Sequence, residues 1–348
     1  MTASPVRVIT GTLVALACAA SVATVGAAVP ATGASTSDQG VANARPVAGC
    51  RVFPRNNYWN ADISGLPKNR KSDAWIRHMS PRSELHPDFG RAYGDQPVPY
   101  GIPITVVGAG HRRVNVHFHY ARESDRVRYP LGKDSKIEGG QRSDGDRHVI
   151  IVDKSRCKLY ETWNTRKRNG HWTAGSGAVW SLRRNALRPD GWTSADAAGL
   201  PILPGLLRWG EVKRGEVDHA IRFTTDVTDN RYVWPARHSA GAVNNRNYPP
   251  MGARFRLKAS FDMSGYGKRA RVVLHAMQKY GLVLADNGSP WYFQGEATNK
   301  WPSSLISDLK GVPARAFVAV DTKSLLVGPD SARVARRRGS GRSRGADR

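Results

Sequence analysis

The segment HVIIVDKSRCKLYETW occupies residues 148–163 and contains two short runs with the character of β-strands. Residues 148–152 and 158–163 have the β-branched or alternating composition that strands prefer. Runs of the same character, separated by turn residues, recur on both sides of this segment, at 102–107, 114–118, 178–182, 220–224, 255–257, 282–285, 291–293 and 317–320. The sequence therefore predicts a fold built mainly from short strands.

Helical patterns are few. One is expected over residues 72–79, beginning at Ser72, and another over 268–280, ending at Gly281. Because helices do not alternate with strands, a parallel α/β sheet is disfavoured, and we expect a mainly β fold, a β-sandwich or jelly roll with a few peripheral helices. The turn sequence at 286–288, Asp-Asn-Gly, is expected to join two late strands as a hairpin.

The amino terminus has the layout of a secretory signal peptide, with Arg7, an apolar run and then small residues. An uncleaved membrane anchor is the alternative, because about 18 apolar residues just cross a bilayer. We therefore expect a secreted, extracellular or wall-associated protein with no membrane span after signal cleavage. The expected parts are a signal peptide (1–34), a linker (35–49), a β-rich domain (50–321) and a disordered Arg-rich tail (322–348) with little apolar content.

Two cysteines, Cys50 and Cys157, follow the predicted signal peptide. Free thiols are uncommon in the oxidising compartments that exported proteins reach, so a disulfide between them is expected. It would tie the start of the mature chain to the middle of the domain, a constraint worth about 4 kcal/mol in the chain-entropy model. Two unpaired buried thiols are the alternative.

The formal net charge is +25, and the Arg-rich tail accounts for only a minority of it. A cationic domain attracts polyanions, which outside a cell are acidic polysaccharides, anionic wall polymers or free nucleic acid. The alternative is a charge that serves solubility or reflects codon bias. The partner expected from charge and export is an extracellular glycan or an anionic wall polymer.

His117 and His119 are the residues most like metal ligands. Side chains two apart on a strand share a face, so both imidazoles can reach one divalent ion, and Glu123 follows closely. The spacing is similar to the first metal motif of cupin jelly rolls, although the surrounding glycines are displaced and no second motif follows. A solvated His pair on a strand edge is the alternative, and no other cofactor is expected.

Carboxylates and histidines next to glycines and strands are candidate catalytic groups. Glu138 precedes two glycines, His148 begins a strand, and Glu161 lies on the next strand. Paired carboxylates flanking a cleft suit glycosidic cleavage, one as a protonated acid and one as base or nucleophile. The alternative places Glu138 in a turn, with Asp146 and Arg147 as a structural ion pair.

The region from 188 to 224 is dense in Trp, Asp, Gly and Pro, as in a loop that a rigid scaffold holds at a site. Its candidate catalytic residues are Asp196, His219 and Arg222, of which the last two offer a base and a carboxylate-binding fork. A structural plug at one end of a sandwich is the alternative. Candidate substrate-binding residues, including aromatic faces for sugar stacking, are Trp180, Arg188, Trp192 and His238.

Four blocks carry a resemblance to a known family: GWTSADAAGLPILPGL from Gly191, HAIRFT from His219, PPMG from Pro249 and YGLVLADNG from Tyr280. Together they resemble an uncharacterised family of bacterial exported proteins that often accompany carbohydrate-binding or lectin-like modules. The resemblance covers most of residues 50–321. It implies export and a link to carbohydrate, and it transfers no catalytic residue.

Other motifs are absent from the sequence. Gly175-Ser176-Gly177 is not a nucleophile elbow, and there is no His-Glu-x-x-His, Cys-x-x-Cys, phosphate-binding loop or dinucleotide fingerprint. Nucleotide-dependent and zinc-protease functions are therefore not expected.

Two functions fit the sequence. The first is a secreted carbohydrate-active enzyme, a glycoside hydrolase or polysaccharide lyase acting on an extracellular and acidic glycan. A lyase would use Arg222 to neutralise a uronate and His219 or Tyr160 as the base, whereas a hydrolase would pair Glu138 with Glu161 or Asp196. The second is a non-catalytic glycan- or wall-binding protein tethered by its basic surface. The sequence leaves both open.

Overall fold

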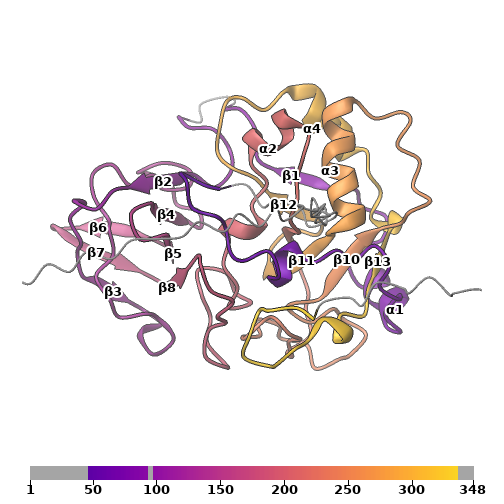
Figure 1. Cartoon of the computed structure of the whole chain (residues 1–348), viewed down its shortest axis with the longest axis horizontal. Helices are drawn as coiled ribbons and strands as arrows, with labels where there is room; N and C mark the ends of the chain where they lie inside the picture. Colours follow the sequence, from indigo (N-terminus) through magenta and orange to yellow (C-terminus); the bar gives the residue numbers. More distant parts are fainter. Residues whose placement is uncertain (1–45, 93–96, 336–348) are drawn as a thin grey trace, which may run out of the picture. The chain divides into compact units, whose positions relative to one another are not determined.

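The computed structural model describes residues 46–92 and 97–335 (Figure 1). The predicted signal peptide (1–34) lies outside the described residues, as do most of the predicted linker and the tail from 336 onward. Within the described residues, thirteen strands form three sheets and four helices accompany them. The predicted mainly β fold is confirmed, whereas the finer prediction of a β-sandwich or jelly roll is not.

The largest sheet has six strands in a mixed arrangement. Its order is β1 (His86–Asp88), β12 (Tyr292–Gln294), β9 (Ile221–Thr225), β11 (Leu282–Asn287), β10 (Arg254–Leu257) and β13 (Phe317–Ala319). Strand β9 runs parallel to β11 and antiparallel to β12. The predicted hairpin at 286–288 is therefore wrong, because β9 lies between the two strands that this turn was expected to pair.

A four-stranded sheet contains the segment 148–163. Its order is β2 (Ile104–Val107), β4 (Val149–Asp153), β5 (Lys158–Trp163) and β8 (Ser176–Ser181), with β2 parallel to β4 and the other pairs antiparallel. Both faces of β4 are covered, since Ile150 and Val152 join the main core and Val149 and Ile151 join a second, smaller core. Burial on both faces explains why the sequence of this strand is continuously apolar.

A three-stranded sheet lies against the smaller core. It is formed by β3 (Val116–Phe118), β7 (His171–Ala174) and β6 (Arg166–Arg168), with β3 parallel to β7. Trp172 on β7 is buried in the smaller core together with Tyr129 and Tyr160. This core therefore joins the three-stranded sheet to one face of the four-stranded sheet.

The four helices are α1 (Ser72–Arg77), α2 (Trp209–Arg214), α3 (Lys268–Lys279) and α4 (Ser303–Lys310). Both predicted helices exist. Helix α3 packs beside β10 (Figure 1), and the chain leaves it at Gly281, whose φ of +74° is one that glycine adopts without strain. Ser72 does not cap α1: its hydroxyl instead accepts the backbone N–H of Ala319 on the neighbouring strand. No helix among the described residues is long and apolar enough to cross a bilayer.

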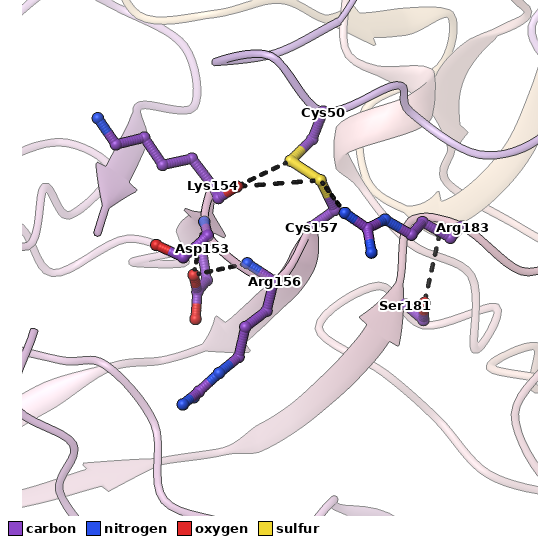
Figure 2. Close-up of a disulfide and its surroundings, with 8 residues drawn as sticks. Cys50, Asp153, Lys154, Arg156, Cys157, Ser181 and Arg183 are labelled. Atoms are coloured by element: carbon purple, nitrogen blue, oxygen red, sulfur yellow. Dashed lines mark hydrogen bonds between the residues drawn. A yellow bond between two sulfur atoms is a disulfide. The ribbon is translucent and has the colours of Figure 1, made fainter. Parts of the chain in front are cut away.

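The predicted disulfide between Cys50 and Cys157 is present (Figure 2). Cys157 belongs to the turn between β4 and β5, where Asp153 accepts the backbone N–H of Arg156, and the guanidinium of Arg183 lies 3.7 Å from the Cys157 sulfur. Cys50 is buried in the main core. The disulfide therefore fixes the first residues of the domain to the four-stranded sheet.

The domain extends beyond the predicted boundary at 321. Ala332 is buried, its carbonyl accepts the N–H of Tyr58, and Arg333 pairs with Asn57 as an isolated bridge. Arg237 also donates to the carbonyl of Pro329. The sequence prediction assigned 322–335 to the disordered tail because the tail as a whole has little apolar content, whereas Leu325 and Ala332 supply buried apolar contacts.

Candidate active site

A cavity of about 290 Å³ opens beside the end of β11 and the loop 193–197. Small-molecule sites commonly begin at about this volume. We call it the acidic cavity, because its titratable and aromatic lining comprises Tyr120, Glu123, Asp146, Trp163, His238 and Asp286. Tyr120 and Trp163 lie 6.4 Å apart between ring centroids and form its aromatic side. The lining thus combines flat apolar faces with carboxyl groups.

Asp286 reaches the cavity through an irregularity in β11. The pairing of β11 with β9 shifts register between Leu284 and Asp286, so that Ala285 is an extra residue, and its carbonyl accepts the N–H of Ala198 from the neighbouring loop. Such bulges change the direction in which a strand projects its side chains. The residues before Asp286 are buried, whereas its own side chain is 23% exposed.

The carboxyl of Asp286 is backed by a buried ion pair. The guanidinium of Arg222 donates from Nε and Nη2 to the two oxygens of Asp196, at 2.9 and 2.6 Å, and its Nη2 lies 3.6 Å from Oδ2 of Asp286. Burial, together with the nearby Asp196 carboxylate, raises the pKa of Asp286 well above its usual range, and Arg222 offsets this only in part. Asp286 is thus placed to hold a proton at the cavity surface.

A second ion pair, Glu138 with His148, supports the loop that forms the cavity wall. Nδ1 of His148 donates to Glu138 at 2.6 Å, and Nε2 donates to the carbonyl of Ala195, a lining residue, at 3.2 Å. Burial lowers the pKa of His148, but the Glu138 carboxylate outweighs it and raises this pKa to about 9. His148 is therefore an imidazolium at neutral pH, able to donate from both nitrogens.

Glu161 lies in the same buried region, on β5. Its two carboxyl oxygens accept the backbone N–H groups of Ile202 and Leu203 at 2.9 and 2.8 Å. Burial raises the pKa of Glu161 to about 7, although those two hydrogen bonds lower it. Glu161 therefore holds the loop after Gly199 in place and does not line the cavity.

The loop from Thr193 to Leu200 is fixed by its own hydrogen bonds. The hydroxyl of Ser194 contacts the carbonyls of Asp196 and Leu200, and Ser176 donates to the carbonyl of Ser194 at 2.5 Å. Gly199 has a φ of +69°, and a Cβ there would lie 2.4 Å from the carbonyl oxygen of Trp192. Glycine is therefore required for this loop to take its shape.

Glu123 and His238 form a pair on the other side of the cavity. Glu123 accepts the N–H of Thr193 at 3.1 Å, and its Oε2 lies 3.8 Å from Nε2 of His238. Nδ1 of His238 donates to the carbonyl of Ala197 at 2.8 Å, which directs Nε2 toward Glu123. Both side chains are about one-third exposed, so that this pair is open to solvent and to a ligand.

The structure gathers five of the six predicted catalytic residues, Glu138, His148, Glu161, Asp196 and Arg222, into one buried network behind the acidic cavity. None of the five lines the cavity itself. His219 lies elsewhere, hydrogen-bonded through Nε2 to Glu211, which also pairs with Arg208.

The predicted substrate-binding residues are divided in the same way. His238 lines the cavity, whereas Trp180 is buried in the main core and Arg188 packs over the rings of Trp180 and Trp192. Arg188 also donates to Asp125 at 2.7 Å, so that its charge is already paired. Arg188 and Trp180 are thus held by contacts within the protein and do not line the cavity.

His117 lies on β3 and His119 in the turn that follows it, both exposed, and Glu123 is directed toward Thr193 and His238. Among the described residues, no cluster of three or more His, Cys, Asp or Glu side chains is arranged to hold a metal ion. A divalent metal at the His117 and His119 pair stays a prediction.

Sequence reasoning missed Asp286, Tyr120 and Trp163 as parts of the site. Asp286 was assigned to a hairpin turn, because Asp-Asn-Gly is a strong turn signal. A polar pair directly after the apolar run 282–285 was the signal that could have identified it.

No protein-family model, no curated protein and no solved structure matches this chain.

Proposed function

We propose that the protein is an exported carbohydrate-active enzyme that hydrolyses an extracellular glycan in the acidic cavity. One observation carries the proposal: Asp286 lies at the surface of a cavity with aromatic walls, and burial together with the Asp196 carboxylate behind it favours its protonated form. A protonated carboxyl beside an ionised carboxylate is the combination that glycosidic cleavage needs.

The proposed reaction assigns a role to each side of the cavity. Asp286 donates its proton to the leaving oxygen as the bond between that oxygen and the anomeric carbon breaks. The pair of Glu123 and His238 accepts a proton from the water whose oxygen bonds to the anomeric carbon. Tyr120 and Trp163 provide faces on which sugar rings stack. Proton exchange with solvent returns Asp286 and the Glu123 pair to their starting states.

Hydrolysis is favoured over elimination by the location of the lyase candidates. Arg222 is buried and bound by both oxygens of Asp196, His219 is bound to Glu211, and Tyr160 is buried in the smaller core with its hydroxyl against Arg113. None of the three lines the acidic cavity. His238 is the histidine in the cavity lining, so that elimination from a uronate is the second outcome to measure.

A panel of neutral and uronic acid glycans, incubated with the mature protein, tests the proposal. New reducing ends without ultraviolet-absorbing products would support hydrolysis, whereas unsaturated products absorbing in the ultraviolet would support lyase chemistry instead. Binding to a glycan without any product would contradict the enzyme proposal and support the non-catalytic glycan-binding function. The Asp286→Asn variant serves as the matched inactive control, because it removes the proposed proton donor and keeps the shape of the cavity.

A further inference from the structure

A second cavity, of about 540 Å³, lies between β2, helix α2 and the segment that precedes Cys50. We call it the basic pocket, because five cationic side chains line it: Lys136, Arg208, Lys213, Arg214 and Lys300. Arg208 is paired with Glu211. It shares no lining residue with the acidic cavity. The two cavities therefore offer separate places for a ligand.

The other four cations, Lys136, Lys213, Arg214 and Lys300, are not held by a close carboxylate of the described chain, although the charge of Lys300 acts on Glu296. Within the described residues, none of them forms an ion pair with a carboxylate. They come from three separate segments of the chain, so that their gathering here is a result of the fold. Clefts lined by one sign of charge concentrate ligands of the opposite sign.

The two carboxyl groups of the basic pocket do little to cancel this charge. Glu211 is held by Arg208 and His219, and both of its oxygens are used in those contacts. Glu296 accepts the backbone N–H of Trp209 at 2.8 Å, and burial raises its pKa, which disfavours its charged form. The pocket thus keeps a net positive potential.

The walls of the pocket are held rigidly. Val47 and Cys50 exchange backbone hydrogen bonds, and the disulfide to Cys157 fixes this segment, so that Pro46 and Val47 form a constrained wall. On the opposite side, Glu211 and Glu296 tie down the start of α2. A rigid pocket loses little entropy when a ligand binds.

The number and type of cations indicate a polymer with repeated charges. Three of these four cations, Lys136, Lys213 and Lys300, are ammonium groups, which are compact point charges that do not require a planar partner. A single phosphate or carboxylate would satisfy only one or two of the four groups, whereas a chain with one charge per repeat can reach all of them. The size of the pocket matches a short segment of such a chain.

A glycan polymer fits the pocket better than a nucleic acid. Single-stranded nucleic acids are usually held by base stacking on aromatic side chains. Trp209 is the single aromatic residue in the described lining, and it is already engaged by the guanidinium of Arg269 at 5.5 Å and by the ring of Trp301 at 5.4 Å. We propose that the basic pocket binds an anionic glycan polymer, independently of chemistry in the acidic cavity.

The test measures binding of two anionic polymers, poly(glycerol phosphate) and polygalacturonate, to the mature protein by isothermal titration calorimetry. Comparison of the two distinguishes phosphodiester from uronate as the source of charge. The variant Lys213→Glu with Arg214→Glu should bind at least about tenfold more weakly at low salt, and the difference should shrink at about 300 mM NaCl.

The matched control carries the same change of charge on exposed residues outside the pocket, Arg315→Glu with Lys323→Glu, and should bind within about twofold of the unmodified protein. A second pocket variant, Lys136→Gln with Lys300→Gln, covers the case in which the first does not fold. Equal weakening by pocket and control variants would overturn the proposal, as would no binding of either polymer. Pocket-dependent binding of a single-stranded oligonucleotide alone would replace the glycan with a nucleic acid.

Discussion

Oδ2 of Asp286 lies 3.6 Å from Nη2 of Arg222, while both oxygens of Asp196 bind the same guanidinium at shorter distances. Asp196 is completely buried and Asp286 reaches the acidic cavity. Because Asp196 makes the closer contacts with Arg222, a proton on Asp286 gives up only the longer contact at 3.6 Å. This arrangement separates the structural carboxylate from the one that we propose to act on a substrate.

The pair of Arg222 and Asp196 is expected to be essential for stability. Arg222→Met leaves a buried carboxylate unpaired, and we expect the free energy of unfolding to fall by about 3–5 kcal/mol in urea titrations. Adding Asp196→Asn should recover part of this loss. The control Lys68→Met removes an exposed pair with Asp73 and should cost no more than about 1 kcal/mol. Equal losses in both variants would contradict the assignment of a buried pair.

The pair of Glu138 and His148 predicts a pH dependence of stability. The folded-state pKa of His148 is raised to about 9, so that its stabilising effect is complete below the unfolded pKa of about 6.5 and is lost as pH rises through 9. We expect the free energy of unfolding to fall by about 3 kcal/mol between pH 6.5 and 9.

The folded-state pKa of Glu161 is raised to about 7, above its unfolded value of about 4.5. The ionisation of Glu161 therefore also lowers the free energy of unfolding as pH rises from about 4.5 to 7. The matched variant Glu138→Gln removes the partner of His148 and should flatten the profile between pH 7 and 9. Parallel profiles for the two proteins, measured by urea titration, would show that this ion pair does not control the pH dependence.

Gly199 is expected to determine the shape of the cavity wall. Gly199→Ala places a Cβ against the carbonyl oxygen of Trp192 at a φ of +69°, and we expect a loss of about 1–3 kcal/mol in stability together with reduced activity. Gly215→Ala is the control, because its φ is +88° but a Cβ there meets no atom within 4 Å. It should lose stability by about 1–2 kcal/mol and keep its activity.

The disulfide between Cys50 and Cys157 spans 107 residues of sequence. Replacing both cysteines with serine should lower the free energy of unfolding by about 4 kcal/mol, because the unfolded chain gains freedom. Polymer binding in the basic pocket should also weaken, since Pro46 and Val47 lose their anchor. Reduction of the unmodified protein with a thiol should reproduce both effects, and unchanged stability after complete reduction would refute this account.

Local sequence patterns predicted where most strands and helices lie, but not which strands pair with each other. The runs 148–152 and 158–163 lie in strands β4 and β5, and the periodic run before Gly281 is helix α3. The parallel neighbours β9 and β11 were not predicted, because about sixty residues separate them and pairing over such distances depends on the whole core.

The same limit applies to the site. Residue chemistry proposed Glu138, His148, Glu161, Asp196, His219 and Arg222 as separate catalytic candidates, and the structure brings all of them except His219 together. Their burial behind the cavity could not be predicted, since it depends on which side of each strand meets the neighbouring sheet. Asp286 was missed because a bulge, and not the turn that its sequence suggests, directs its side chain.

The most direct test of the central claim is the turnover of a cleaved glycan by Asp286→Asn, compared with Asp144→Asn, which makes the same change at an exposed carboxylate outside the cavity. We predict that Asp286→Asn lowers kcat by about 10²–10⁴-fold while the protein stays folded, because general acid catalysis contributes that much. Asp144→Asn should keep full activity. A folded Asp286→Asn variant with turnover within about twofold of the unmodified protein would contradict the claim.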